Sequence, residues 1–271
     1  MATMMTTMMT TMMTGLLLLL LAGVTVSRVV DLDKRVYNGV PCGENDHRYH
    51  VKLVSVDEQG KKFWSGASLI SPQWILTAGH NVEPGEKVTA ILGFHPGTKV
   101  KEVKITEEPI RYKDLDGTLH DIMLLKLPDA DHGYLPAPLT DCSKAPKITD
   151  TVQIAGIGDT KKNLLTGKKG LSASTALQCG NTKVVECKEI QSCQTANLSH
   201  YNKNEKLFCY LDTDVDESKG DSGGGVEFKG MIYGVHIRGG RDPCDIPGIA
   251  INICDLKYKT WINAVIGLKI L

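Results

Sequence analysis

The sequence predicts an all-β protein, and three observations support this fold class. Short apolar or alternating runs recur between residues 49 and 127. Turn-forming pairs separate them, as at Pro84-Gly85, Pro96-Gly97 and Asp116-Gly117. No long amphipathic helical run interrupts this pattern, which is typical of a β-barrel or a β-sandwich.

The individual elements follow in chain order. Residues 49–56 alternate apolar and polar side chains, and residues 67–75 are apolar with a turn at Ser71-Pro72. Further strands are expected at 87–93 and 99–105. The final segment, 256–268, places Trp261, Ile262, Val265 and Ile266 on one face and predicts a terminal amphipathic helix.

Composition excludes several classes of partner. The chain has 271 residues and 42% hydrophobic residues, enough for one large all-β domain or two small ones. Lys+Arg and Asp+Glu are both 31, so the balance of charge favours neither nucleic acid nor a membrane surface. The eight cysteines include no Cys-x-x-Cys pair, which favours disulfides over a zinc site.

The N-terminus predicts export. Six leucines at 16–21 and the small residues Ala22-Gly23 have the length and ending of a signal-peptide core. The leader before them contains no Lys or Arg, so a signal anchor is the alternative. We assign residues 1–27 to a signal peptide, and we expect a secreted, extracellular protein whose mature chain has no membrane span.

A short charged segment, 28–35, follows the leader and ends in the basic pair Lys34-Arg35. A basic pair before the apolar Val36 is typical of a processing site, although most such pairs lie on solvated surfaces. Residues 28–35 are therefore a candidate propeptide.

Three residues suggest nucleophilic catalysis. His80 ends the apolar run 74–80, and Asp121 opens the apolar run 120–127, where a strand rarely carries a carboxylate. Ser222 lies in the glycine-rich turn 220–224, whose backbone can approach a bound group closely. Each feature alone is more often structural, but together they provide a nucleophile, a base and a group to orient the base.

Three segments carry a family resemblance. Thr-Ala-Gly-His-Asn at 77–81, Asp-Ile-Met-Leu-Leu at 121–125 and Gly-Asp-Ser-Gly-Gly at 220–224, in that order, closely resemble the signature segments of the chymotrypsin/trypsin-like serine peptidases. The similarity spans about 36–265. It implies two six-stranded antiparallel β-barrels, about 36–140 and 141–254, and a C-terminal α-helix at about 255–268. The active site would lie at the interface between the barrels.

The resemblance also assigns catalytic roles. Ser222 would attack the scissile carbonyl, His80 would act as base and then acid, and Asp121 would orient His80. The N–H groups of Gly220 and Ser222 would form the oxyanion hole. The reaction implied is peptide hydrolysis through an acyl-enzyme.

The resemblance also implies that the chain is activated by proteolytic cleavage. Cleavage after Arg35 would free the α-amino group of Val36, which would become buried and pair with Asp221. The turn that carries Ser222 would then be ordered only after processing, so the resemblance predicts a zymogen.

The primary pocket departs from the family pattern. Asp216 matches the acid that selects Arg or Lys in trypsin-like members, although a solvated acidic loop is the alternative. The usual Ser-Trp-Gly of the opposite wall is Ile237-Arg238-Gly239 here, and Gly248 occupies a further pocket position. Arg238 would either pair with Asp216 and block the pocket or face solvent. The expected enzyme thus has either a primary pocket that Arg238 restricts or an open pocket with Arg238 on its rim.

The resemblance implies disulfides between Cys42 and Cys179, between Cys142 and Cys254, and between Cys193 and Cys209. These leave Cys187 with Cys244, and the alternative is that Cys187 replaces Cys193. The bracing disulfide of the histidine loop is absent at both ends, with Ser65 and Asn81 in its place.

Other expectations concern partners. Asn197 begins the sequon Asn-Leu-Ser and predicts N-glycosylation. We expect a monomer without metal or cofactor, whose partners are a protein or peptide substrate, an activating protease and serpin-type inhibitors. The alternative function is a non-catalytic binding or toxin-like homologue that keeps the fold.

Overall fold

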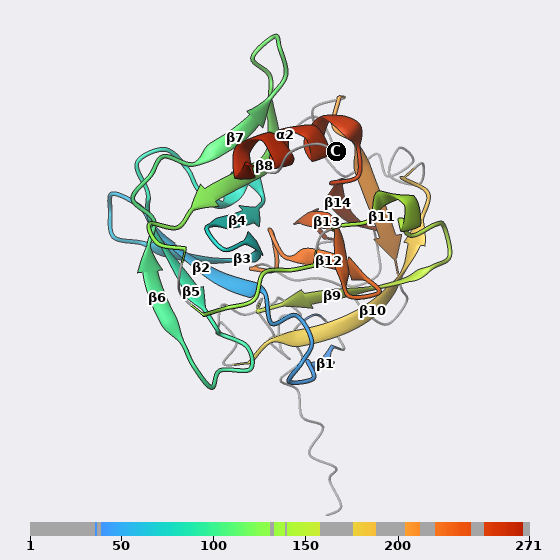
Figure 1. Ribbon diagram of the computed structural model, residues 1–271, viewed down its shortest axis with the longest axis horizontal. Helices are drawn as coiled ribbons and strands as arrows, with labels where there is room; N and C mark the ends of the chain where they lie inside the picture. Colours follow the sequence, from blue (N-terminus) through green and yellow to red (C-terminus); the bar gives the residue numbers. More distant parts are fainter. Residues whose placement is uncertain are drawn as a thin grey trace, which may run out of the picture. The chain divides into compact units, whose positions relative to one another are not determined.

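The fold is that of a computed structural model, which describes residue 36 and residues 39–130, 133–138, 140–157, 176–187, 204–211, 220–239 and 247–267. The proposed signal peptide 1–27 and the candidate propeptide 28–35 lie outside the described residues. Two antiparallel sheets and a C-terminal helix make up the described fold, with the first sheet on the left of Figure 1 and the second on the right.

The first sheet is formed by the N-terminal half of the described chain. Its order is β6-β5-β2-β3-β4-β8-β7. The bounds are β2 His50–Val56, β3 Lys62–Ser71, β4 Trp74–Thr77, β5 Lys87–Leu92, β6 Lys101–Lys104, β7 Ile110–Lys113 and β8 Leu119–Lys126. These bounds confirm the strands expected around 49–56, 67–75, 87–93 and 99–105 to within a few residues, apart from the earlier start of β3.

The two edge strands of this sheet, β6 and β7, follow each other directly in the chain. β6 is paired to β5, and β7 is paired to β8. Residues 105–109 separate them and end in Pro109, which has no N–H to donate to a ladder. The N–H of Ile105 still bonds to the carbonyl of Val88, at 3.0 Å. The half expected to have six strands therefore has seven, because Pro109 divides one of them.

The second sheet closes into a barrel. Its order is β1-β10-β11-β14-β13-β12-β9, and β10 also pairs with β9, so six strands form a ring and β1 extends its edge. The bounds are β1 Val40–Pro41, β9 Thr151–Gly156, β10 Gln178–Val185, β11 Leu207–Leu211, β12 Gly225–Phe228, β13 Met231–Arg238 and β14 Gly248–Asn252.

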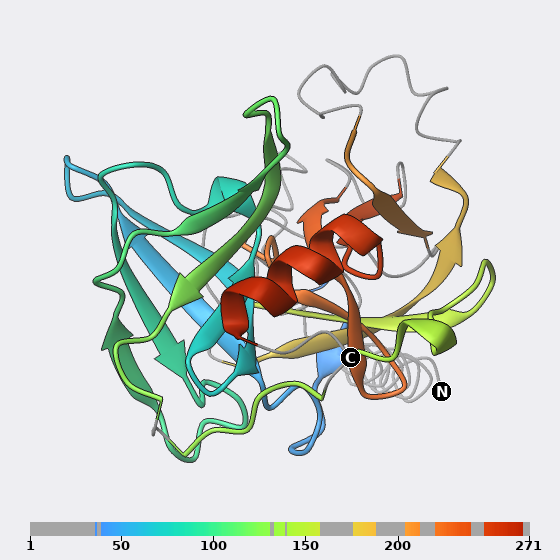
Figure 2. The same cartoon turned by 45° about the horizontal axis from the view of Figure 1, so that its top comes forward.

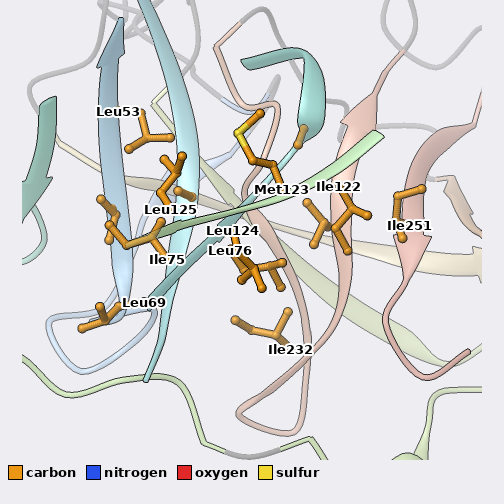
Figure 3. Close-up of a cluster of buried hydrophobic side chains, with 14 of the residues drawn as sticks. Leu53, Leu69, Ile75, Leu76, Ile122, Met123, Leu124, Leu125, Ile232 and Ile251 are labelled. Atoms are coloured by element: carbon orange, nitrogen blue, oxygen red, sulfur yellow. The ribbon is translucent and has the colours of Figure 1, made fainter. Parts of the chain in front are cut away.

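A continuous hydrophobic core joins the two sheets. Leu76 and Leu124 from the first sheet belong to the same buried cluster as Ile232 and Ile251 from the second, and all four are at most 2% exposed. Figure 3 shows Leu76 and Leu124 near the centre of the view, with Ile232 below them and Ile251 to the right. Burial of each such side chain contributes about 1.5–3 kcal/mol, so the contact between the sheets is a major part of the stability.

The C-terminal helix α2, Leu256–Ile266, confirms the expected terminal helix. The Asp255 side chain caps it by accepting the N–H of Lys257, and Gly267 ends it with a φ of 77°. Tyr258 and Ile262 are its buried residues, and Figure 2 shows the helix crossing the molecule between the two sheets. No helix in the described ranges is long and apolar enough to cross a bilayer.

The disulfides correct two of the expected pairs. Cys42 is bonded to Cys179, and Cys142 to Cys254, as expected. Cys187 is bonded to Cys209, so the expected Cys193–Cys209 and Cys187–Cys244 pairs are wrong, and the alternative in which Cys187 replaces Cys193 is the one formed.

Strand pairing explains this outcome. β10 and β11 are antiparallel with Val185 opposite Cys209, so the end of β10 brings Cys187 to a Cα–Cα distance of 5.3 Å from Cys209. Cys193 and Cys244 lie outside the described residues.

Candidate active site

The pairing of β4 with β8 brings His80 and Asp121 together. Thr77, the last residue of β4, lies opposite Met123 of β8. Because the strands are antiparallel, residues that follow Thr77 run alongside residues that precede Met123. The chain then turns through the 3-10 helix η1, Gly79–Asn81, which carries His80 to the mouth of β8.

Asp121 binds His80 at two points. Its Oδ2 lies 2.8 Å from Nδ1 of the imidazole, and its Oδ1 accepts the backbone N–H of His80, also at 2.8 Å. The His80 side chain is 45% exposed, so its other ring nitrogen is available on the solvent side. A carboxylate on Nδ1 favours the tautomer in which Nε2 can accept a proton.

Arg111 supports the same turn from β7. Its guanidinium donates to the carbonyl oxygens of Gly79 and Val82, which lie on either side of His80 in the chain. The Val82 contact is 2.8 Å. Arg111 was not a candidate from the sequence, because a basic residue on a short strand has no distinctive signal.

Glu205 is a second site residue that the sequence did not reveal. Its Oε1 accepts the backbone N–H of Asp121 at 2.8 Å. Burial raises the pKa of the Glu205 carboxyl, as does the nearby charge of Asp121, although the hydrogen bond from Asp121 opposes the shift. The other oxygen, Oε2, is buried without a hydrogen-bond partner in the part of the chain described.

The turn at 220–224 has the conformation that its glycines allow. Gly220 has a φ of 101° and Gly223 a φ of 87°, values that residues with a side chain rarely adopt. The Gly223 N–H donates to the carbonyl of His236 at 2.7 Å, and the His236 N–H donates to Gly224 at 2.9 Å. The β13 strand therefore holds the turn in place.

The same turn packs against the first sheet. The N–H of Gly66 in β3 donates to the carbonyl of Ser222 at 2.8 Å. A Cβ added to Gly66 would lie 2.9 Å from the Gly224 nitrogen, and one added to Gly223 would lie 2.2 Å from the Gly66 carbonyl oxygen. Glycine is required on both sides, because the two main chains touch here.

The structure therefore brings the three expected catalytic residues to one junction. His80 lies in η1, directly after β4, and Asp121 in β8 of the first sheet, whereas Ser222 precedes β12 of the second. Ser222 is half-buried. Among the contacts of these described residues, no hydrogen bond joins the Ser222 hydroxyl to His80. Such bonds are often long in a site without substrate and shorten when the complex forms.

Val36 and Asp221, the expected activation pair, are both buried. Val36 is fully buried among apolar side chains that include Val152 and Ile154. Asp221 is 2% exposed, and a Cβ added to Gly156 would lie 1.9 Å from its Oδ1. Only glycine at position 156 leaves room for this carboxylate. Arg35, the expected cleavage position, lies outside the described residues.

A cavity of about 450 Å³ lies beside His80. Both sheets contribute to it, and its lining consists of Gly79, His80, Glu83, Arg111, Leu119, His120, Asp121, Glu205, Ile237 and Arg238. Ile237 is buried and Arg238 is half-buried, so Arg238 contributes a cation to the wall. Gly239 follows at the edge of the described segment. Asp216 lies outside the described residues.

Gly248 has a packing role that the sequence did not reveal. A Cβ at this position would lie 2.3 Å from the Tyr210 ring, so the ring packs directly against the Gly248 backbone. The Tyr210 hydroxyl lies 2.6 Å from Nδ1 of His236. Since His236 also holds the turn at 220–224 through its backbone, Tyr210 and His236 connect Gly248 to the turn that carries Ser222.

Two further expectations concern glycosylation and metal binding. The sequon residue Asn197 lies outside the described residues. Within the described ranges, no group of three or more His, Cys, Asp or Glu side chains is arranged to hold a metal ion.

Comparison with known proteins relates this geometry to one family. The sequence model of the trypsin family matches residues 36–262. Kallikrein-11 of Mus musculus is 27% identical over 265 residues, covering 92% of this chain and 89% of that protein. Trypsin II-P29 of Gallus gallus is 30% identical over 243 residues, covering 87% of this chain and 90% of that protein.

Solved structures agree with the fold. Neuropsin, described as a serine protease expressed in the limbic system of mouse brain, superposes with a TM-score of 0.64 at 24% identity, covering 84% of this chain and 99% of the solved chain. The solved structure of GrC has a TM-score of 0.67 at 22% identity and covers 85% of this chain and 99% of its own.

Proposed function

Because this chain belongs to the trypsin family, we propose that it is a secreted serine endopeptidase that is made as a zymogen and cleaves peptide bonds after Arg or Lys. The observation that carries the proposal is the contact of 2.8 Å between His80 Nδ1 and Asp121 Oδ2, beside Asn81, whose side chain donates to the Ser222 carbonyl. A protein or peptide is the substrate that the family implies.

The chemistry assigns one task to each residue. Asp121 holds the His80 imidazole so that Nε2 faces the site and accepts the proton of the Ser222 hydroxyl. The Ser222 oxygen then attacks the scissile carbonyl, and His80 returns the proton to the leaving amine. In the second half of the reaction, His80 takes a proton from water, which attacks the acyl-enzyme and releases the acyl group from Ser222.

The oxyanion hole would be formed by the backbone N–H groups of Gly220 and Ser222. The φ of 101° at Gly220 supports this assignment, because it allows a tight turn that a residue with a side chain rarely adopts. Donors fixed in this way stabilise the charge that develops in the transition state. Removing one such donor typically costs a factor of about 10²–10³ in kcat.

The zymogen proposal rests on Val36 and Asp221. Both residues are buried, and a buried carboxylate requires a partner that carries charge or donates hydrogen bonds. Cleavage after Arg35 by an activating protease would supply the α-ammonium group of Val36. The mature chain would then begin at residue 36.

We assign selection of the substrate's basic residue to Asp216, and we assign to Arg238 a role in limiting access to the primary pocket. A carboxylate at the floor of the primary pocket selects Arg or Lys by a charge-assisted pair. Arg238 lines the cavity beside His80, so its guanidinium would compete with a basic substrate for Asp216. Gly239 and Gly248 complete the proposed pocket.

A second candidate function is a binding protein that keeps the fold without catalysis. It is favoured by Ile237 and Arg238, which replace the usual Ser and Trp of the pocket wall. The two candidates differ in an experiment: an enzyme cleaves a peptide and loses that activity when a catalytic residue is replaced, whereas a binding protein cleaves nothing.

A substrate panel tests the proposed function. The processed chain is assayed with peptides that differ only at the residue before the scissile bond, with Arg, Lys, Phe or Ala there, and Ser222→Ala is the control. We expect cleavage after Arg and Lys that the control lacks. Cleavage after Phe alone would contradict the specificity, and no cleavage of any peptide would favour the binding protein.

A further inference from the structure

Asn81 connects the histidine turn to the serine turn. It directly follows His80 and is the last residue of η1, Gly79–Asn81. Its Nδ2 donates to the carbonyl oxygen of Ser222 at 2.9 Å. The same nitrogen donates to Thr77 Oγ1 at 2.9 Å and approaches the carbonyl oxygen of Gly66 at 3.4 Å. One half-buried amide thus joins its own turn, at Thr77, to Gly66 in β3 and to Ser222, which is 141 residues away.

The surroundings of this amide require a hydrogen-bond donor. The Thr77 hydroxyl uses its proton to bond to the Gly66 carbonyl, at 2.8 Å, so its oxygen can only accept from Asn81. The other two neighbours of Nδ2 are carbonyl oxygens. A carboxylate at position 81 would face three oxygen atoms, whereas an amide can donate to two of them and approach the third.

The serine turn has no room to slide past this contact. A Cβ added to Gly223 would lie 2.4 Å from Asn81 Nδ2 and 2.2 Å from Thr77 Oγ1. The carbonyl of Ser222 also accepts the N–H of Gly66, at 2.8 Å. The main chain of Ser222 is therefore fixed by one donor from β3 and one from η1, and the second belongs to the residue next to His80.

We propose that Asn81 is a positioning residue for catalysis, which sets the distance between Ser222 and His80 by binding the Ser222 carbonyl. The inference rests on the proposed function and deepens it. Because His80 and Asn81 are consecutive in one short helix, whatever fixes Asn81 to Ser222 also fixes His80 relative to Ser222. A misplacement of about 1 Å in such a pair can reduce the rate by about 10²-fold.

The first test compares kcat and KM. In processed protein, Asn81→Ala should lower kcat by roughly 10- to 100-fold and change KM by less than about threefold, because the contact aligns reacting groups and does not touch substrate. The rate of Ser222 labelling by an organophosphorus probe should fall by a similar factor.

The second test uses the pH profile of an isosteric variant. Asn81→Asp places a carboxyl among three oxygens, and only its protonated form can donate a hydrogen bond. The activity of Asn81→Asp relative to the unaltered enzyme should therefore rise as the pH falls from 8 to 5. The relative activity of Asn81→Ala should stay constant over the same range. A purely structural loss would not produce this difference between the two variants.

Asn252→Ala is the matched control. Its side chain also makes a local hydrogen bond, by accepting the N–H of Cys254 at 3.0 Å, and it lies outside the site. Its kcat should be unchanged when assayed below the unfolding temperature of every variant. If Asn81→Ala keeps kcat within twofold, or if Asn81→Asp shows no gain at low pH, the positioning role is wrong.

The labelling experiment distinguishes the two levels of the proposal. An unaltered, processed chain that never labels at Ser222 would remove both the proposed function and this inference. A chain that labels normally, with Asn81→Ala and Asn81→Asp labelling at the same rate, would leave the proposed function intact and overturn only the role of Asn81.

Discussion

The backbone N–H of Asp121 donates a hydrogen bond to the side chain of Glu205 at 2.8 Å. This places a second carboxyl group next to the acid that orients His80, on a segment 84 residues further along the chain. Glu205 is thus joined to the residue that orients His80 through the main chain of Asp121.

Glu205→Gln removes the charge of this carboxyl group, and the amide oxygen of the new side chain can still accept the N–H of Asp121.

Glu205→Gln should be more stable than the unaltered protein at neutral pH. Since the folded pKa of Glu205 is raised by burial, the folded state binds more protons than the unfolded state between the unfolded and folded pKa values. The free energy of unfolding therefore falls as the pH rises through that window. Glu205→Gln should raise the melting temperature more at pH 7 than at pH 4. Equal shifts at both values would argue against a charge effect.

His50 predicts loss of stability in acid. Burial lowers the pKa of His50 to about 3, and the neighbouring His47 and His95 contribute to the shift. Below pH about 6.5 the unfolded chain takes up a proton that folded His50 does not accept. The contribution of His50 to the free energy of unfolding should then decrease by up to about 1.4 kcal/mol for each pH unit between about 6.5 and 3.

Chemical denaturation of His50→Leu at pH 7, 6, 5 and 4 measures this contribution. The variant should show a flatter loss of stability with falling pH than the unaltered protein. Parallel pH curves for His50→Leu and the unaltered protein would show that His50 is not the source.

Arg35→Gln tests the activation step. The variant should remain uncleaved after treatment with an activating protease and should show little hydrolysis of an Arg substrate, because the Val36 α-amino group would not be released. Lys34→Gln, which keeps Arg35, should still be activated. Full activity in an uncleaved Arg35→Gln chain would exclude the zymogen mechanism.

Arg238→Trp tests the restricted pocket. If the guanidinium competes with basic substrates for Asp216, then kcat/KM for small Arg substrates should rise several-fold in the variant. Arg238→Ala should show a rise as well, because the effect depends on removal of the cation. No rise in either variant would mean that Arg238 does not block the pocket.

Local pattern predicted much of the fold. The alternation at 49–56 and the apolar run after residue 67 correspond to β2 and β3, and the amphipathic end of the chain forms α2. The strand β7, Ile110–Lys113, was not expected, because only four residues carry its alternation. The Cys187–Cys209 bond was not chosen, because the pairing register of β10 with β11 cannot be read from cysteine spacing.

The site was predictable where its residues carry a motif. His80 and Asp121 lie in distinctive segments, and the structure places their side chains 2.8 Å apart. Glu205, by contrast, lies in an ordinary polar segment, and only the folded chain brings it to Asp121, which lies 84 residues earlier. Asn81 was visible as a departure from the family pattern, but its contact with Ser222, 141 residues away, depends on the docking of two sheets.

The most direct test of the central claim is covalent labelling of Ser222 in the processed chain with an organophosphorus serine probe, followed by peptide mass analysis. We expect one phosphoryl adduct, located on Ser222, which is absent in Ser222→Ala and forms far more slowly in His80→Ala. A folded chain that begins at Val36 and carries no adduct on Ser222 would contradict the account.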